Sequence, residues 1–145
     1  MTRDRLLFLP ALARGADAAL LALRLLTGAF LIHGVWDNIT SAERMAEFEG
    51  FLAANGFTLP GLMAPLSVWA QFACGVLLIP GLLTRWAGLV LTFNFIVAVA
   101  MVHWLQDFRS WWPAIVLVGL GLLFATHGAG RWSADHALAT SRASA

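Results

Sequence analysis

The stretch Ala18–Trp36, AALLALRLLTGAFLIHGVW, decides the fold, because it is long, apolar and interrupted by a single charged side chain, Arg24. At about 1.5 Å per residue, roughly 20 helical residues cross a hydrocarbon core of about 30 Å. Arg24 lies roughly two turns inside the stretch. Its long side chain can therefore reach towards the nearer membrane surface or pair inside a bundle. We predict a membrane-spanning helix here.

Composition extends this prediction to the rest of the chain. Hydrophobic residues make up 60% and charged residues 12% of the 145 residues, whereas a soluble domain has about 45–50% and about 25%. Three more apolar stretches, at about 62–83, 86–105 and 111–127, are long enough to span a bilayer. We therefore predict an all-α fold, a transmembrane four-helix bundle over residues 18–127. Residues 1–17 precede it, and residues 128–145 are predicted to be a flexible tail.

Residues 37–61 form the one sizeable predicted loop. Within it, Ser41–Asn55 has Met45, Phe48 and Phe51 at helical spacing, which predicts a short amphipathic helix. Two interpretations remain open, an interfacial helix lying on the lipid headgroups and a lid over a site in the bundle. In the following span, Pro65 is expected in the first turn, and Pro80-Gly81 is expected to kink or end the helix.

Arginine and tryptophan positions indicate how the chain is oriented. With four spans, the side that carries both termini also carries more arginines, namely Arg3, Arg5, Arg14, Arg85, Arg131 and Arg142. The other side carries Arg44 and Arg109. The positive-inside rule therefore predicts both termini in the cytoplasm and the amphipathic helix outside. Six tryptophans fall near span ends, as in an aromatic belt: Trp36, Trp86, Trp104, Trp111, Trp112 and Trp132.

Several function classes lack their sequence signals. No basic run follows a phosphate backbone, so no nucleic-acid partner is predicted. The single cysteine, Cys74, excludes an internal disulfide or CxxC pair. There is no HExxH, phosphate loop, serine nucleophile motif or Rossmann glycine pattern. The spacing of the histidines and carboxylates matches no closed metal site, so no metal is predicted.

The candidate site comes from the depth of the few polar residues. Four of them lie towards the outer ends of the first three spans and could converge on one extracytoplasmic pocket: His33, Asp37, Gln71 and His103. Arg24 and Arg85 lie towards the inner side. Asn94, nine residues before His103, faces roughly the opposite way on an ideal helix and is left out of this pocket.

Each of these residues also has a purely structural interpretation. His33 and His103 lie near the headgroup boundary, where an imidazole has an ordinary interfacial role. Gln71 and Asn94 fit interhelical hydrogen bonds, each worth about 0.6–2 kcal/mol. Cys74 fits a small packing residue.

A family resemblance follows from four segments, taken in order along the chain. They are Leu23-Arg24-Leu25-Leu26-Thr27-Gly28 with Leu31-Ile32-His33-Gly34, then Phe51 to Pro60, then Gly75 to Arg85, then Ala98 to His103. Together they resemble the first three helices of the DoxX family. The resemblance covers roughly residues 20–105 and implies a four-helix protein of the bacterial inner membrane.

The resemblance also implies possible functions. Some DoxX members are quinone-linked thiosulfate oxidoreductase subunits, and others belong to oxidative-stress or thiol-redox complexes. This predicts a redox-associated membrane subunit that binds a quinone or another apolar small molecule. Members commonly have Lys where this chain has Asp37, and Glu where it has Gln71, which argues against conserved redox chemistry.

The alternative is a non-enzymatic scaffold or assembly subunit of a larger membrane complex. A transporter is a third possibility, although no inverted repeat is visible in the sequence. Besides the lipid bilayer, the partners left open are membrane or redox proteins and a second copy of the chain. The sequence does not decide whether the protein is an enzyme.

Overall fold

The computed structural model describes residues 9–104 and 106–143, apart from the side chain of His103. The described part contains helices and connecting turns and no strand, so the predicted all-α class is confirmed. In chain order its elements are η1 (Pro10–Gly15), α2 (Ala16–Thr40), α3 (Ala42–Ala54), α4 (Pro60–Leu78), α5 (Thr84–Ala98), η2 (Val99–His103), α6 (Phe108–His127) and α7 (Ala134–Ala143).

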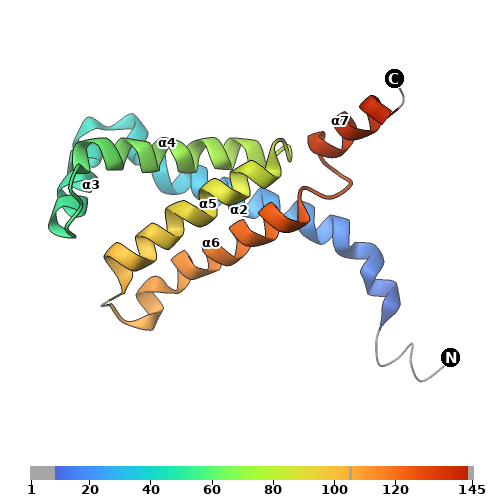
Figure 1. Cartoon of the computed structure of the whole chain (residues 1–145), viewed down its shortest axis with the longest axis horizontal. Coiled ribbons are helices and arrows are strands. Elements are labelled where there is room, and N and C mark those ends of the chain that lie inside the picture. The colour runs from blue at the N-terminus through green and yellow to red at the C-terminus, as the bar shows by residue number, and fades with distance from the viewer. Residues whose placement is uncertain (1–8, 105, 144–145) are drawn as a thin grey trace.

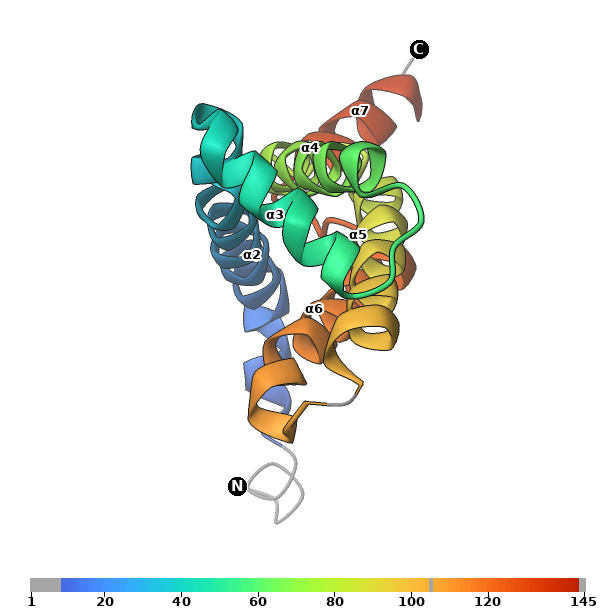
Figure 2. The ribbon, with the colours of Figure 1, turned by 90° about the vertical axis from the view of Figure 1, so that its left-hand side faces the viewer.

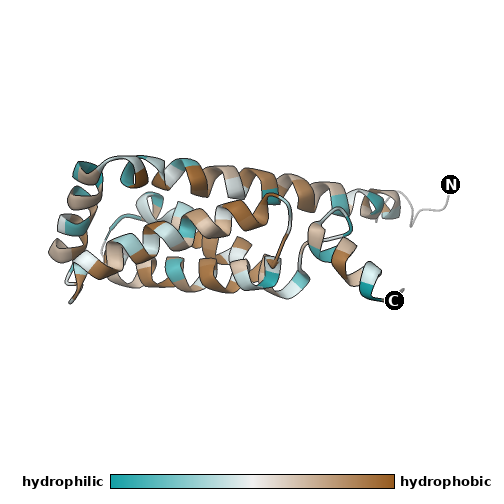
Figure 3. Cartoon of the chain, turned by 90° about the horizontal axis from the view of Figure 1, so that it is seen from above, coloured by the Kyte–Doolittle hydropathy of each residue, from teal (hydrophilic) through white to brown (hydrophobic). Residues whose placement is uncertain are grey.

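Four helical segments of the described chain are long and apolar enough to cross a membrane. They are Pro10–Thr40, Pro60–Leu78, Thr84–Val102 and Phe108–His127, which confirms the predicted four spans. Hydrophobic residues dominate the long helices, and hydrophilic residues gather towards the ends of the bundle (Figure 3). Tryptophans at the span ends are exposed, as an aromatic belt requires: Trp36, Trp86, Trp104, Trp112 and Trp132.

The four spans pack in the order α2, α4, α5, α6. The helix α3 lies across one end of the bundle, and η1 and α7 lie at the other (Figures 1 and 2). We call these the α3 end and the α7 end. The core between the spans is apolar, with Leu31, Leu78, Leu91 and Phe124 almost fully buried.

Glycines bring two pairs of helices into backbone contact. A Cβ placed on Gly28 of α2 would lie 2.8 Å from the carbonyl oxygen of Gly75 of α4, and the reverse distance is also 2.8 Å. Gly88 of α5 and Gly121 of α6 form a similar pair. Such small-residue contacts drive helix association in lipid, where burial of apolar surface gives little gain. Gly119, two residues before Gly121 on α6, faces open space instead.

The boundaries of two spans differ from the prediction. The helix α2 continues past Trp36 to Thr40, where Ser41 adopts an extended backbone and ends it. Its hydroxyl accepts a hydrogen bond from the backbone N–H of Arg44 and so caps α3. The helix α4 begins at Pro60, so Pro65 lies inside the helix and not in its first turn. It ends at Leu78, ahead of Pro80, and this matches the expected effect of that proline.

The C-terminal segment is more ordered than the flexible tail expected from its composition. Residues 134–143 form α7, and the carboxylate of Asp135 accepts hydrogen bonds from the backbone N–H groups of Leu83 (2.7 Å) and Thr84 (2.9 Å). These N–H groups lie at the start of α5, where the backbone has no acceptor within the helix. A carboxylate at this end is also favoured by the helix dipole. Asp135 therefore ties the segment to the bundle.

Candidate functional site

An apolar cavity of about 570 Å³ lies beneath α3, between α4 and α5. Its volume is within the range of about 300–1,000 Å³ that is usual for small-molecule sites. Aromatic and aliphatic side chains form most of its wall. The lining residues are Phe48, Phe51, Leu52, Phe57, Met63, Leu66, Ser67, Ala70, Gln71, Val90, Phe93, Asn94, Phe95, Val97, Ala98 and Val102. We call this the α3 pocket.

Three polar side chains form a hydrogen-bonded row in the wall of the α3 pocket. The Gln71 amide donates from Nε2 to the Ser67 hydroxyl at 3.1 Å, and that hydroxyl donates to Oδ1 of Asn94 at 2.8 Å. Ser67 and Gln71 share one face of α4 because they are four residues apart. Within the described residues, Asn94 Nδ2 and Gln71 Oε1 make no further hydrogen bond. The row therefore offers a bound molecule one donor group and one acceptor.

The helix α3 forms the roof of this pocket. Leu52 is its one buried residue and anchors it to the bundle, while Phe48 and Phe51 stack with ring centroids 6.3 Å apart. The helix ends where Asn55 Nδ2 bonds the carbonyl of Phe51 and Gly56 adopts a positive φ of 82°. Of the two interpretations of this amphipathic helix, a cover over a cavity fits its position among the lining residues.

His33 and Asp37 do not line the α3 pocket. Both side chains are exposed, because the buried face of α2 follows positions 24, 28, 31 and 35, and His33 lies about 200° around the helix from Leu31. Of the four predicted residues, the structure thus brings Gln71 to the cavity and leaves His33 and Asp37 on the outside. His103 ends η2, and its side chain lies outside the described part of the chain.

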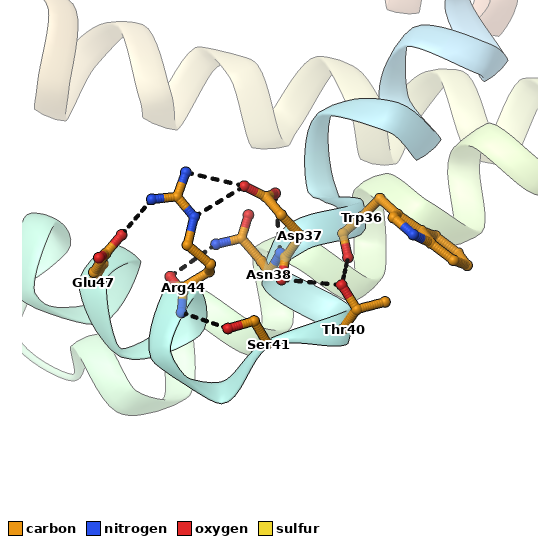
Figure 4. Close-up of polar contacts among 7 residues, drawn as sticks. All are labelled: Trp36, Asp37, Asn38, Thr40, Ser41, Arg44 and Glu47. Atoms are coloured by element: carbon orange, nitrogen blue, oxygen red, sulfur yellow. Dashed lines mark hydrogen bonds and ion pairs between the residues drawn. The ribbon is translucent and has the colours of Figure 1, made fainter.

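Asp37 instead belongs to a surface network with Arg44 (Figure 4). Arg44 Nη2 lies 3.2 Å from Asp37 Oδ2, and Arg44 Nη1 lies 2.6 Å from Glu47 Oε2. The hydrogen bond to Asp37 and the charge of Glu47 raise the pKa of Arg44. Asn38 donates to the Arg44 carbonyl at 3.0 Å. These contacts hold α3 against the end of α2.

Ser67 and Asn94 line the α3 pocket, and the sequence analysis did not place them in the candidate site. Asn94 was left out because it faces away from His103 on an ideal helix, but it lines the same cavity as Gln71. A usable signal was present in the sequence, since Ser67 and Gln71 put two polar groups on one face of an apolar span. Asn94 was then the natural partner, because polar groups within a span are seldom left unpaired.

Arg24 was predicted either to reach towards the nearer membrane surface or to pair inside the bundle, and the structure shows it paired within the protein. Its side chain is fully buried, and Nη2 donates to the carbonyl oxygen of Trp132 at 2.6 Å. A Cβ at position 81 would overlap Nη1, so the guanidinium occupies space that only Gly81 leaves free. Nε and Nη1 have no hydrogen-bond partner among the described residues. Arg24 therefore links the first span to the C-terminal segment.

The remaining polar candidates have structural roles. Arg85 Nη1 donates to the carbonyl oxygens of Ala125 and Thr126 at 2.8 and 2.6 Å, which caps the end of α6. Cys74 is buried and its thiol contacts the carbonyl of Ala87 at 3.5 Å. In the described part of the chain, no group of three or more His, Cys, Asp or Glu residues is placed to hold a metal ion.

Comparison with known proteins agrees with this architecture. No curated protein and no solved structure matches the chain. The family model named DoxX matches residues 19–104, from the first turns of α2 to the residue after η2. The matched range is more than half of the chain and includes every residue that lines the α3 pocket. The chain therefore belongs to the DoxX family.

Proposed function

We propose that this protein binds an apolar, membrane-soluble molecule with one polar end, in the first place a quinone, in the α3 pocket. The observation that carries the proposal is the cavity of about 570 Å³ with apolar walls and a single polar row. We further propose a redox-associated role in the bacterial inner membrane, with the pocket on the extracytoplasmic side.

The lining residues fit a quinone ring. Phe51, Phe57 and Phe93 offer flat apolar surfaces, and aromatic groups pair favourably in offset or edge-on geometry. Asn94 Nδ2 is free to donate a hydrogen bond to a ring carbonyl, and Gln71 Oε1 is free to accept one from a ring hydroxyl. A site with both groups can hold either the oxidised or the reduced form.

A bound quinone would supply two-electron chemistry that no described lining residue supplies itself. None of these residues titrates near neutral pH, so the described wall orients a ligand by hydrogen bonding and does not remove its proton. His33 and Asp37 are exposed and do not line the pocket, so the proposal assigns them no proton transfer. We therefore propose a binding subunit that presents the molecule to a partner protein.

Removal of the polar row tests this proposal. With Asn94→Leu, we expect a short-chain quinone analogue to bind about tenfold more weakly, because a hydrogen bond in the pocket is lost. Ala70→Phe should abolish binding, because the added ring fills the cavity. Isothermal titration calorimetry on the protein in detergent measures both effects.

Thr126→Val is the matched control for these variants. Its hydroxyl bonds to Leu122 of its own helix at 2.7 Å, far from the α3 pocket, so its removal should leave binding unchanged. Wild-type protein that binds no quinone analogue and co-purifies with no redox-active absorbance would overturn the proposal. That result would favour the scaffold alternative.

The proposed orientation gives a separate prediction. In a Cys74→Ala background, the substitution Ala53→Cys on α3 should be labelled by a membrane-impermeant maleimide on intact bacterial cells. Ala139→Cys on α7 should be labelled only after permeabilisation. Both positions are exposed, so a difference in labelling reports the side of the membrane. Labelling of Ala139→Cys on intact cells, with labelling of Ala53→Cys only after permeabilisation, would indicate the opposite orientation.

A further inference from the structure

A second pocket of about 570 Å³ lies at the α7 end of the bundle, away from the α3 pocket. It is formed by the start of α5, the end of α6, Asp17 of α2 and the segment that follows α6. Unlike the α3 pocket, it is lined by ionisable side chains: Asp17, Arg85, His127, Arg131, Asp135 and His136.

The two carboxylates in this pocket already have partners. Asp17 Oδ1 accepts the backbone N–H of Arg131 at 2.9 Å. Both oxygens of Asp135 accept backbone N–H groups at the start of α5, and its charge also attracts the buried Arg24. Neither carboxylate forms a salt bridge with an arginine of the pocket, since the ion pairs of the described chain all involve Arg44.

The two arginines are left with free donors. The Arg131 guanidinium makes no hydrogen bond or ion pair within the described residues. Arg85 directs Nη1 at the carbonyls of α6, while Nη2 has only a long contact of 3.4 Å to the His127 carbonyl. A Cβ on Gly128 would lie 3.5 Å from both Nε and Nη2. Gly128 therefore lies beside the Nε–Nη2 edge of Arg85 without a side chain against it, and Nε makes no hydrogen bond among the described residues. Such an edge can bind phosphate with two parallel hydrogen bonds.

The pocket lies at a depth that the phosphate of a membrane lipid can reach. The pocket lies where α5 begins and α6 ends, which is the level of the lipid headgroups when these helices span the bilayer. Leu83 and Trp86 line it beside the arginines and are largely exposed. Basic pockets between span ends bind anionic lipid headgroups, and exposed apolar side chains next to them can contact acyl chains.

We propose that this pocket binds the phosphate of an anionic phospholipid, held by the Nε–Nη2 edge of Arg85 and by Arg131. The proposal is independent of quinone binding, because the two pockets share no lining residue. The lipid would connect α5, α6 and the C-terminal segment through its headgroup.

The test compares lipids of different charge on the purified full-length chain. Native mass spectrometry should show phosphatidylglycerol retained more strongly than phosphatidylcholine, because choline neutralises the phosphate. Arg131→Gln should weaken phosphatidylglycerol binding about tenfold, because a charge-assisted contact is lost. Arg85→Lys keeps the charge but not the planar edge, and should weaken binding as well.

Arg109→Gln is the matched control, because Arg109 is exposed at the α3 end and lies outside this pocket. It should leave lipid retention unchanged. Equal retention of the two lipids, or an equal loss with Arg109→Gln, would overturn the proposal. A thermal-shift arm with millimolar inorganic phosphate distinguishes the sources. Stabilisation by phosphate equal to that by phosphatidylglycerol would identify a soluble-anion site and overturn the lipid assignment.

Discussion

Gly81→Ala is expected to lower the free energy of unfolding by about 3–5 kcal/mol, the range typical of disrupting a buried charge and its partners. Gly81 follows α4 with a φ of +70°, and an L-residue in the left-handed region costs about 1–2 kcal/mol. The larger share comes from Arg24, because the new Cβ would overlap its Nη1 and would lie 2.7 Å from Cβ of Ser133. The guanidinium would have to move away from the Trp132 carbonyl.

The measurement is the midpoint of thermal unfolding in detergent, together with the protease sensitivity of residues 128–143. Both should change in Gly81→Ala, because Arg24 holds that segment. Gly34→Ala is the control, since a Cβ at Gly34 of α2 meets nothing within 4 Å. If Gly81→Ala and Gly34→Ala had equal unfolding midpoints, the absence of a side chain at position 81 would not be required for the position of the Arg24 guanidinium.

Gly88→Ala should also lower the free energy of unfolding, for a different reason. A Cβ at this position would lie 2.5 Å from the backbone nitrogen of Ala125 and 2.6 Å from the carbonyl oxygen of Gly121. Backbone atoms cannot rotate away, so α6 must separate from α5, and overpacking of this kind costs about 1–3 kcal/mol or more. The separation would also loosen the hydrogen bonds from Arg85 to the end of α6.

In a titration with a denaturing detergent, Gly88→Ala should begin to unfold at a lower mole fraction of that detergent than the unmodified chain. Gly119→Ala is the matched control on α6, because no atom lies within 4 Å of a Cβ at Gly119. If both variants unfold together, the contact between Gly88 and Gly121 does not set the spacing of these helices.

The spans were predictable because membrane insertion depends on properties that sequence carries directly. Length, apolar composition and the placement of tryptophans identify a spanning helix without knowledge of its neighbours. The amphipathic helix α3 was predictable for a similar local reason, because Met45, Phe48 and Phe51 recur at helical spacing. The end of α2 was not, because Asp37 to Thr40 have no strong preference and continue the helix.

The site was less predictable because it depends on how helices rotate against one another. Depth placed His33, Asp37 and Gln71 at similar levels, but the contact of Gly28 with Gly75 fixes the face that α2 turns inwards. That face carries Arg24 and Leu31, and it turns His33 outwards. The order of the C-terminal segment was missed because composition does not reveal that Asp135 caps α5 from 51 residues away.

The pairing of Arg24 with Trp132 has a consequence for biogenesis. The acceptor is made 108 residues after the donor, so α2 enters the membrane with an unpaired guanidinium. An arginine at the centre of a span costs about 2.5–3.5 kcal/mol on the translocon scale, which is an upper bound for Arg24, and Trp132 can offset this cost only after the last span has been made. The pairing of Arg24 is therefore completed only when the C-terminal segment joins the first helix.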